Sequence, residues 1–230
     1  MICPIDTGRY GSEEIRRIFD EENKLQRMLD VEAALAKALA DLGEIPREAA
    51  EVIAKNADIK VVTVEKVKEK EKKTKHDIVA MVEVLAETCG EYGEYVHWGA
   101  TSYDIVDTAW ALLFKEALEI LEEEFLELTE QLRRKAEDYS ELVMPGRTHG
   151  QHAIPVTLGF KFAVYLSEFT RHLERLREMK KRVLVGKMSG AVGTQAAFGE
   201  DGFEIEKEVM RLLNLKPAII SSQIIPRDSY

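Results

Sequence analysis

The chain has 230 residues, of which 45% are hydrophobic, so it is long enough to bury a core of its own. Its 32 Lys and Arg residues against 42 Asp and Glu residues give a net charge of −10. Because binding along a nucleic acid requires a basic surface, this balance disfavours nucleic-acid binding as the main activity.

The amino-terminal segment lacks the basic and apolar regions of a signal peptide. No apolar run reaches the roughly 18 residues that a membrane helix requires. Only Cys3 and Cys89 are present, too few for a disulfide framework. These features favour a cytoplasmic enzyme without a membrane partner.

Apolar residues recur at steps of three and four along most of the chain, which is the pattern of amphipathic α-helices. In the first hundred residues the pattern predicts helices over residues 13–42, 46–54 and 63–90. Gly43 ends the first, Pro46 opens the second and Thr63 is a suitable N-cap for the third.

Two longer helices are predicted over residues 104–143 and 155–183, and another over residues 200–213. At about 1.5 Å per residue, the first is a rod of roughly 60 Å. A short loop joins the two long helices, so we expect an antiparallel helix pair, the usual start of a long bundle. Since no alternating strand pattern is longer than residues 60–62, we predict an all-α fold.

Two parts of the chain are expected, a small helical amino-terminal domain in residues 1–105 and the first part of a central long-helix bundle in residues 106–230. Few helices follow the two long ones, so their apolar stripes need cover from further sequence or from other subunits. We therefore expect the chain to be part of a longer protein that associates with itself.

The densest group of reactive side chains is the stretch Gly146–Pro155, GRTHGQHAIP, which we expect to be a loop before a helix. Imidazole titrates near neutral pH, so His149 is a candidate acid or base. Helix capping and loop hydrogen bonding explain the stretch about as well. His149 and His152 have the spacing His-x-x-His, but the further ligands of a zinc site are missing, so we expect no metal.

Two other stretches lie at predicted helix ends. Residues 73–77, KTKHD, place His76 beside Asp77, and the neighbouring lysines suit a carboxylate or a phosphate. Residues 97–104, HWGATSYD, place Thr101 and Ser102 at the positive end of the first long helix, where an anion can bind. An exposed helix turn and simple capping are the alternatives.

The glycine-rich segment 186–193, GKMSGAVG, does not match a phosphate-binding loop, because Met188 follows Lys187 and position 181 is Lys. Flexible connection or close helix packing is the better interpretation of its glycines.

Taken together, these stretches resemble the fumarase/aspartase superfamily, whose members eliminate fumarate from succinyl compounds. Residues 146–153, GRTHGQHA, look like the central motif of that superfamily, and residues 97–107, HWGATSYDIVD, look like its first motif. The branch that the chain resembles most is that of the adenylosuccinate lyases, through RYGS at 9–12, TKHD at 74–77 and SQIIPRD at 222–228.

The resemblance implies roles for particular residues and no cofactor. His149 would be the general acid that protonates the leaving nitrogen, and His76 would orient the substrate or share the proton transfer. The remaining residues would bind the substrate. Arg9, Tyr10 and the run Lys75, His76 and Asp77 would bind the nucleotide phosphate. Thr101 and Ser102 would bind a succinyl carboxylate, and Gln223 would form a hydrogen bond with the substrate.

The resemblance also implies a homotetramer with each site built from several subunits. The superfamily's mobile loop with the serine base is not found in the sequence, so the chain is expected to be inactive alone. Lys75 stands where many relatives have Arg, and it lacks the bidentate fork of Arg. Argininosuccinate lyase is the nearest enzymatic alternative, and an all-α interaction scaffold is the alternative without chemistry.

Overall fold

A computed structural model describes residues 10–229, and the contacts within it divide the chain into two compact units. Unit 1 contains the described residues up to 116 together with those from 182 onward. Unit 2 contains residues 117–181. The predicted domain boundary at residue 105 lies inside unit 1 and stays a prediction.

Unit 1 is a helical unit built around its longest complete helix, α2. Its helices are α1 (Glu13–Ile18), α2 (Glu21–Asp41), α3 (Arg47–Asn56), α4 (Val64–Thr74), α5 (Asp77–Thr88), α8 (Gly202–Leu212) and the first part of α6 (Ser102–Asp138). Short 3-10 turns occupy Gly90–Tyr95, Gly199–Asp201 and Arg227–Ser229, and the two-residue strands β3 (Val185–Gly186) and β4 (Lys216–Pro217) pair in parallel.

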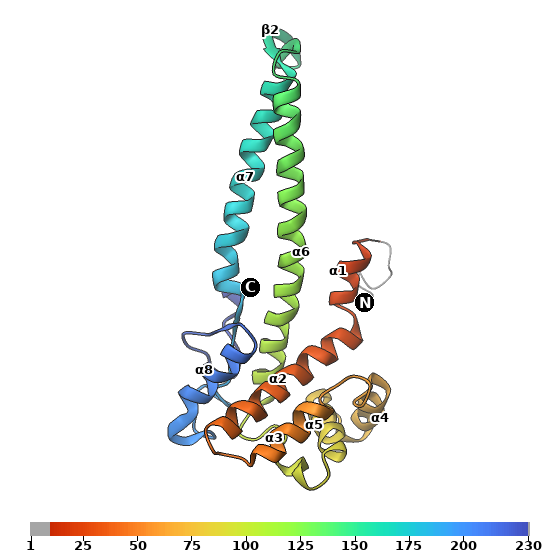
Figure 1. Cartoon of the computed structure of the whole chain (residues 1–230), viewed down its shortest axis with the longest axis vertical. Coiled ribbons are helices and arrows are strands. Elements are labelled where there is room, and N and C mark those ends of the chain that lie inside the picture. The colour runs from red at the N-terminus through yellow and green to blue at the C-terminus, as the bar shows by residue number, and fades with distance from the viewer. Residues whose placement is uncertain (1–9, 230) are drawn as a thin grey trace. The chain divides into compact units, whose positions relative to one another are not determined.

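The core of unit 1 forms where α2 packs against α3 and α8 (Figure 1). Fully buried apolar side chains come from each of these helices, among them Leu35 and Leu39 of α2, Ile53 of α3 and Met210 of α8. Their spacing along α2 is the helical periodicity that the sequence shows, so burial of this stripe holds the unit together.

Two of the predicted helices are each divided in two. The helix predicted over residues 13–42 breaks at Asp20, whose side chain accepts a hydrogen bond of 2.7 Å from the amide of Asn23 and caps α2. The helix predicted over residues 63–90 breaks at Lys75, which ends α4 with a φ of 58°, and His76 then caps α5. Thr63 caps α4 as predicted.

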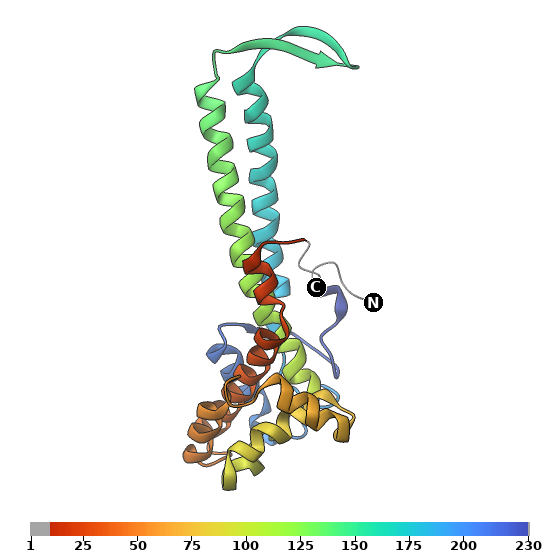
Figure 2. The ribbon, with the colours of Figure 1, turned by 90° about the vertical axis from the view of Figure 1, so that its right-hand side faces the viewer.

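Unit 2 consists of the second part of α6, a β-hairpin and most of α7 (Leu158–Val183). The two helices run antiparallel side by side, with the hairpin at one end (Figures 1 and 2). Phe125 and Phe169 pack with ring centroids 5.9 Å apart, and Glu122 of α6 accepts hydrogen bonds from Arg177 and Lys180 of α7. The predicted antiparallel helix pair is confirmed.

The predicted loop between the long helices is instead a β-hairpin of β1 (Val143–Thr148) and β2 (Gln151–Thr157). Thr148 pairs with Gln151, and the two residues between them, His149 and Gly150, both have positive φ, as in a type I′ turn. Most residues of both strands are exposed, so no apolar alternation marks them in the sequence. Within residues 10–229, no helix combines the length and apolar composition needed to cross a bilayer.

Candidate active site

The amino-terminal end of α6 is held by a buried carboxylate, that of Asp104. Its oxygens accept hydrogen bonds from the amides of Thr101 at 2.8 Å, Ser189 at 2.9 Å and Gly190 at 3.1 Å. Asp104 also pairs with the ammonium group of Lys187, and both side chains are fully buried. The start of α6, with Thr101 and Ser102, is therefore fixed against the segment 187–190.

Further buried polar groups bind the same segment. Thr108, one turn after Asp104, donates to the carbonyl of Lys187 and accepts from its amide. Glu206 of α8 accepts from the amide of Met188 at 2.9 Å, and burial raises the pKa of this carboxyl. Residues 186–190 of the glycine-rich segment are thus buried, and a Cβ at Gly186 would lie 2.6 Å from the sulfur of Met210. Close packing is the correct interpretation of Gly186, whereas Gly190 has a φ of 78° and a Cβ there would meet no atom closer than 3.9 Å.

Gln223 lies in an exposed segment that reaches the same region. The hydroxyls of Ser189 and Ser221 are 2.9 Å apart, and a Cβ at Gly193 would lie only 2.0 Å from the carbonyl oxygen of Ser221. The segment with Gln223 thus packs on the loop that Asp104 holds. The segment with Gln223 and the start of α6 with Thr101 and Ser102 are thus connected through Asp104 and Ser189.

Lys75, His76 and Asp77 form a second group at the junction of α4 and α5. His76 accepts a hydrogen bond from the amide of Val79 through Nδ1 at 3.4 Å, and its Nδ1 lies 3.4 Å from Oδ1 of Asp77. The side chains of His76 and Asp77 are exposed, at 47% and 70%. His76 therefore caps α5 and has the exposure needed for contact with a ligand.

His97 forms a buried ion pair that the sequence does not reveal. Its Nδ1 lies 2.6 Å from Oε1 of Glu32 in α2, and Glu32 is buried. Burial lowers the pKa of His97, but the charge and hydrogen bond of Glu32, with a contribution from Asp104, outweigh it and raise the pKa above its usual value. The pair favours the charged imidazolium.

The turn of the hairpin in unit 2 presents His149 to solvent. His149 has a φ of 52°, and Arg147 pairs across the strands with His152; all three side chains are exposed. A positive φ is uncommon for a residue other than glycine. The central motif is thus an exposed hairpin tip rather than a loop that caps a helix.

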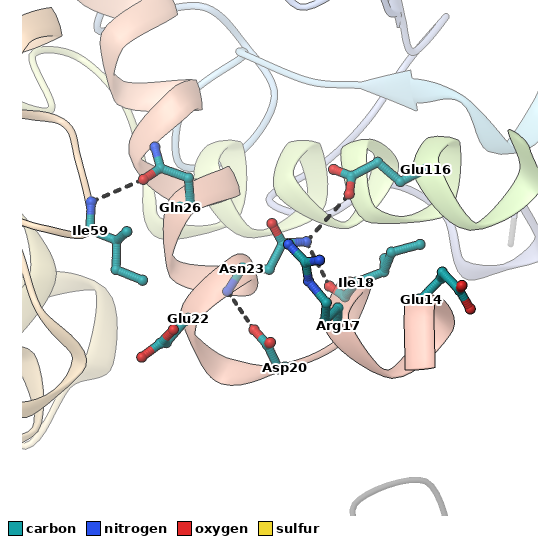
Figure 3. Close-up of a pocket in the computed structure, with 9 residues that line it drawn as sticks. All are labelled: Glu14, Arg17, Ile18, Asp20, Glu22, Asn23, Gln26, Ile59 and Glu116. Atoms are coloured by element: carbon teal, nitrogen blue, oxygen red, sulfur yellow. Dashed lines mark hydrogen bonds between the residues drawn. The ribbon is translucent and has the colours of Figure 1, made fainter. Parts of the chain in front are cut away.

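A cavity of about 400 Å³ lies elsewhere in unit 1, against α1 and α2 (Figure 3). Its lining residues are Glu14, Arg17, Ile18, Asp20, Glu22, Asn23, Gln26, Ile59 and Glu116, and Figure 3 shows Asn23 bonded to Asp20, to Glu116 and to the backbone of Ile18. Four carboxylates against one guanidinium disfavour an anionic ligand. None of the predicted site residues lines this cavity, so it is a poor candidate for the site.

The predicted site residues are therefore divided between the two units. Lys75, His76, Asp77, Thr101, Ser102 and Gln223 belong to unit 1, as does Tyr10, which is 63% exposed, and His149 belongs to unit 2. Arg9 lies outside the described residues. Within residues 10–229, no group of three or more His, Cys, Asp or Glu side chains is arranged to hold a metal ion.

Sequence reasoning missed the buried polar residues that support the site, namely Glu32, Asp104, Asp107, Lys187 and Glu206. Two signals were available. Asp104 and Asp107 are spaced by three residues, which places both on one face of a helix that is otherwise apolar there. Glu32 is the one charged residue in the run 31–36, VEAALA, so its burial requires a partner.

The chain is similar to known proteins over its whole length. The adenylosuccinate lyase of Pyrococcus horikoshii is 60% identical over 229 residues, which cover 100% of this chain and 51% of that protein. The adenylosuccinate lyase of Methanocaldococcus jannaschii is 57% identical over 230 residues, 100% of this chain and 50% of that protein. The chain spans about half the length of the curated relatives it matches.

Solved structures show the same fold. The crystal structure of a fumarate lyase from Mesorhizobium sp. BNC1 superposes with a TM-score of 0.86 at 38% sequence identity, covering 92% of this chain and 51% of that one. Residues 8–230 match the family described as Lyase. The chain therefore belongs to the Lyase family, within the fumarase/aspartase superfamily that its motifs resemble.

Proposed function

We propose that this chain is the amino-terminal half of an adenylosuccinate lyase, a carbon–nitrogen lyase of purine biosynthesis. The enzyme would eliminate fumarate from adenylosuccinate to give AMP, and from the succinylated aminoimidazole carboxamide ribotide. The observation that carries this proposal is the 60% identity, over the whole chain, with a relative of that name. The matched stretch includes the hairpin tip, the α4–α5 junction and the start of α6.

The reaction is a β-elimination with a defined need for an acid. A base removes the proton from the carbon next to a carboxylate, the electron pair forms the carbon–carbon double bond, and the carbon–nitrogen bond breaks. His149 would give a proton to the departing nitrogen, so that a neutral amine leaves. The exposure of His149 at the tip of the hairpin supports this role, because it leaves the imidazole accessible to a substrate. The serine base is expected outside this chain.

The substrate carries anionic groups at both ends, and the binding residues would be arranged accordingly. Thr101 and Ser102 would hold a succinyl carboxylate at the amino-terminal end of α6, where the helix dipole favours negative charge. Arg9, Tyr10 and the Lys75–Asp77 junction would hold the phosphate. Because capping uses Nδ1 of His76, its Nε2 is the nitrogen left for the substrate.

The active enzyme would be a cytoplasmic homotetramer without cofactor, in which several subunits build each site. The apolar side chains exposed on the long helices support association. The amino-terminal domain would comprise residues 1–105, and residues 106–230 would begin the bundle. Nucleic acids would not be partners, because the net charge is −10.

The test is fumarate release from adenylosuccinate by the full-length protein, followed through the accompanying absorbance change. We expect His149→Ala to lower kcat by about 10²- to 10⁴-fold, the usual contribution of a general acid. His172→Ala is the matched control, because His172 is a half-exposed histidine on α7 that pairs with Glu168. That variant should retain full activity.

Each contrary outcome has a definite meaning. If the folded wild-type protein releases no fumarate from adenylosuccinate, the proposal is wrong, and the same assay with argininosuccinate tests the nearest alternative. If wild type releases fumarate and His149→Ala has the same kcat, the protein is a lyase but His149 is not its general acid. Failure with both substrates would favour an interaction scaffold.

A further inference from the structure

The segment with Gln223 is attached to α6 through a second buried carboxylate, that of Asp107. One oxygen of Asp107 accepts a hydrogen bond of 2.8 Å from the amide of Ile225. Arg227 binds the two oxygens of the same carboxylate, from NH1 at 3.1 Å and from NH2 at 3.1 Å. A single carboxylate therefore holds both a backbone group and a side chain of the segment 221–227.

Arg227 contacts both Tyr103 and Asp107. Its guanidinium group lies over the ring of Tyr103, 5.8 Å from the ring centre, while it binds Asp107 with its fork. Tyr103 and Asp107 also line a cavity of about 330 Å³ with Trp110 and Phe114. Asp107 is 2% exposed and Arg227 is 47% exposed, so the pair joins the buried side of α6 to the surface segment.

The Asp107–Arg227 pair, called the clamp below, lies close in sequence to predicted site residues on both of its sides. Asp107 lies five residues after Ser102 on α6, and Arg227 lies four residues after Gln223. Asp104, one turn earlier on the same helix, fixes the loop 187–190 on which Ser221 rests. The two ends of the segment 221–227 are thereby tied to the helix that begins with the predicted carboxylate-binding residues.

We propose that Asp107 and Arg227 act as positioning residues that fix Gln223 relative to Thr101 and Ser102, and so set the affinity for the substrate. This inference rests on the proposed function, in which Gln223 contacts the substrate. Neither residue needs to touch the substrate, because the pair acts through the backbone between Ile225 and Arg227. The effect of breaking the pair should therefore require Gln223.

The experiment measures KM and kcat for fumarate release from adenylosuccinate by the full-length protein. We expect Arg227→Gln to raise KM about tenfold and to change kcat less, because it loosens a binding group without touching the acid. Arg227→Lys should restore only part of the affinity, because Lys lacks the bidentate fork. Arg211→Gln is the matched control, since Arg211 binds Glu208 on α8 through an exposed, bidentate contact.

The decisive variant is the double substitution. If the clamp acts through Gln223, adding Arg227→Gln to Gln223→Ala should produce no further rise in KM. If the rises in KM of the two single variants multiply in the double variant, Arg227 acts independently of Gln223. If the KM of Arg227→Gln equals that of Arg211→Gln, the proposed role of the clamp is wrong. Wild-type protein without lyase activity would instead overturn the proposed function, which separates the two failures.

Hydrogen exchange gives a reading that does not depend on activity. The amide of Ile225 should exchange slowly in wild type and faster in Arg227→Gln and in Asp107→Asn, while amides of α8 keep their rates. Asp107→Asn retains an oxygen for Ile225 but loses the charge that binds Arg227. Unchanged exchange at Ile225 in both variants would overturn the inference even where a variant is too unstable for kinetics.

Discussion

Three residues of the candidate motifs share an uncommon backbone conformation. Lys75, His97 and His149 have φ values of 58°, 62° and 52°, and the other non-glycine residues with positive φ among the described ones are Gln195 and Asn214. The left-handed conformation costs about 1 kcal/mol for such residues. At His149 the two-residue type I′ turn requires this conformation, and Lys75 adopts it where it ends α4.

This strain leads to a prediction for His149→Asn. Asn followed by Gly is the preferred sequence of a type I′ turn, so the variant should leave the thermal unfolding midpoint unchanged or slightly raised. Asn carries no titratable nitrogen, so kcat for fumarate release should fall as far as in His149→Ala. Thermal unfolding and steady-state kinetics of the two variants check this. A large loss of stability in the Asn variant would mean that the imidazole supports the structure.

The buried pair of Glu32 and His97 makes stability depend on pH. The pKa of His97 is raised in the folded protein, so the pair contributes fully below the ordinary value of 6.5 and its contribution is lost as the pH rises through the folded pKa. Glu32→Gln should cost about 2 kcal/mol at about pH 6, and less at about pH 9.

Urea unfolding of wild type and Glu32→Gln at both pH values measures this difference. Glu22→Gln serves as the control, because Glu22 lies on the same helix and is exposed. An equal cost of Glu32→Gln at the two pH values would show that the contact does not depend on the charge of His97.

At the scale of elements, the helices could be predicted from the sequence and the hairpin could not. The apolar stripes of α2 and α8 are buried against other helices, and those of α6 and α7 have the same spacing of three and four although parts of them are exposed. The strands β1 and β2 bury almost nothing, and their pairing follows from a two-residue turn at His149 and Gly150. The turn has His149 where the usual signal has Asn before Gly, so the sequence does not show the Asn-Gly pattern.

The breaks within predicted helices have a related cause. Asp20 and His76 are N-caps in short breaks of two residues between consecutive helices, so the prediction of one helix runs through each break. The same limit applies to the candidate site. The exposed motif residues are recognisable by type, whereas Asp104, Asp107 and Lys187 work through contacts between residues about 80 to 120 positions apart, which no local pattern records.

The helix pair of unit 2 depends on a close approach at Gly159. A Cβ at this position would lie 2.4 Å from the carbonyl oxygen of Ala136 and 2.7 Å from Cα of Ser140, both backbone atoms of the facing segment. Replacing Gly by Ala in a helix ordinarily stabilises by up to about 1 kcal/mol. Here we expect Gly159→Ala to destabilise by about 1–3 kcal/mol, since the helices must separate.

Urea unfolding of Gly159→Ala measures whether the substitution lowers the free energy of unfolding, as we expect, or raises it. Ala163→Gly, at an exposed position one turn further along α7, is the control and should cost about 1 kcal/mol by helix propensity alone. A more stable Gly159→Ala variant would show that the two helices do not approach this closely in solution.

At the scale of the whole molecule, the long helices leave several large apolar side chains exposed. Leu121, Leu126 and Leu128 of α6 are 39–44% exposed, and Phe160 and Val164 of α7 are 63% and 52% exposed. Phe160 and Val164 are spaced by four residues, so they lie on one face of α7. Contiguous exposed apolar faces of this kind mark surfaces that other chains cover.

The proposed tetramer makes this face of α7 a subunit contact. A carboxylate placed there would have to be buried without a partner, so Phe160→Glu should dissociate the full-length protein into smaller species. Light scattering coupled to size-exclusion chromatography measures the mass, and Glu174→Lys, an exposed charge change on the same helix, should leave it unchanged. Since several subunits would build each site of the proposed tetramer, dissociation should also abolish fumarate release. A Phe160→Glu protein of unchanged mass and activity would mean that this face is not covered, and that the sites form without the contact.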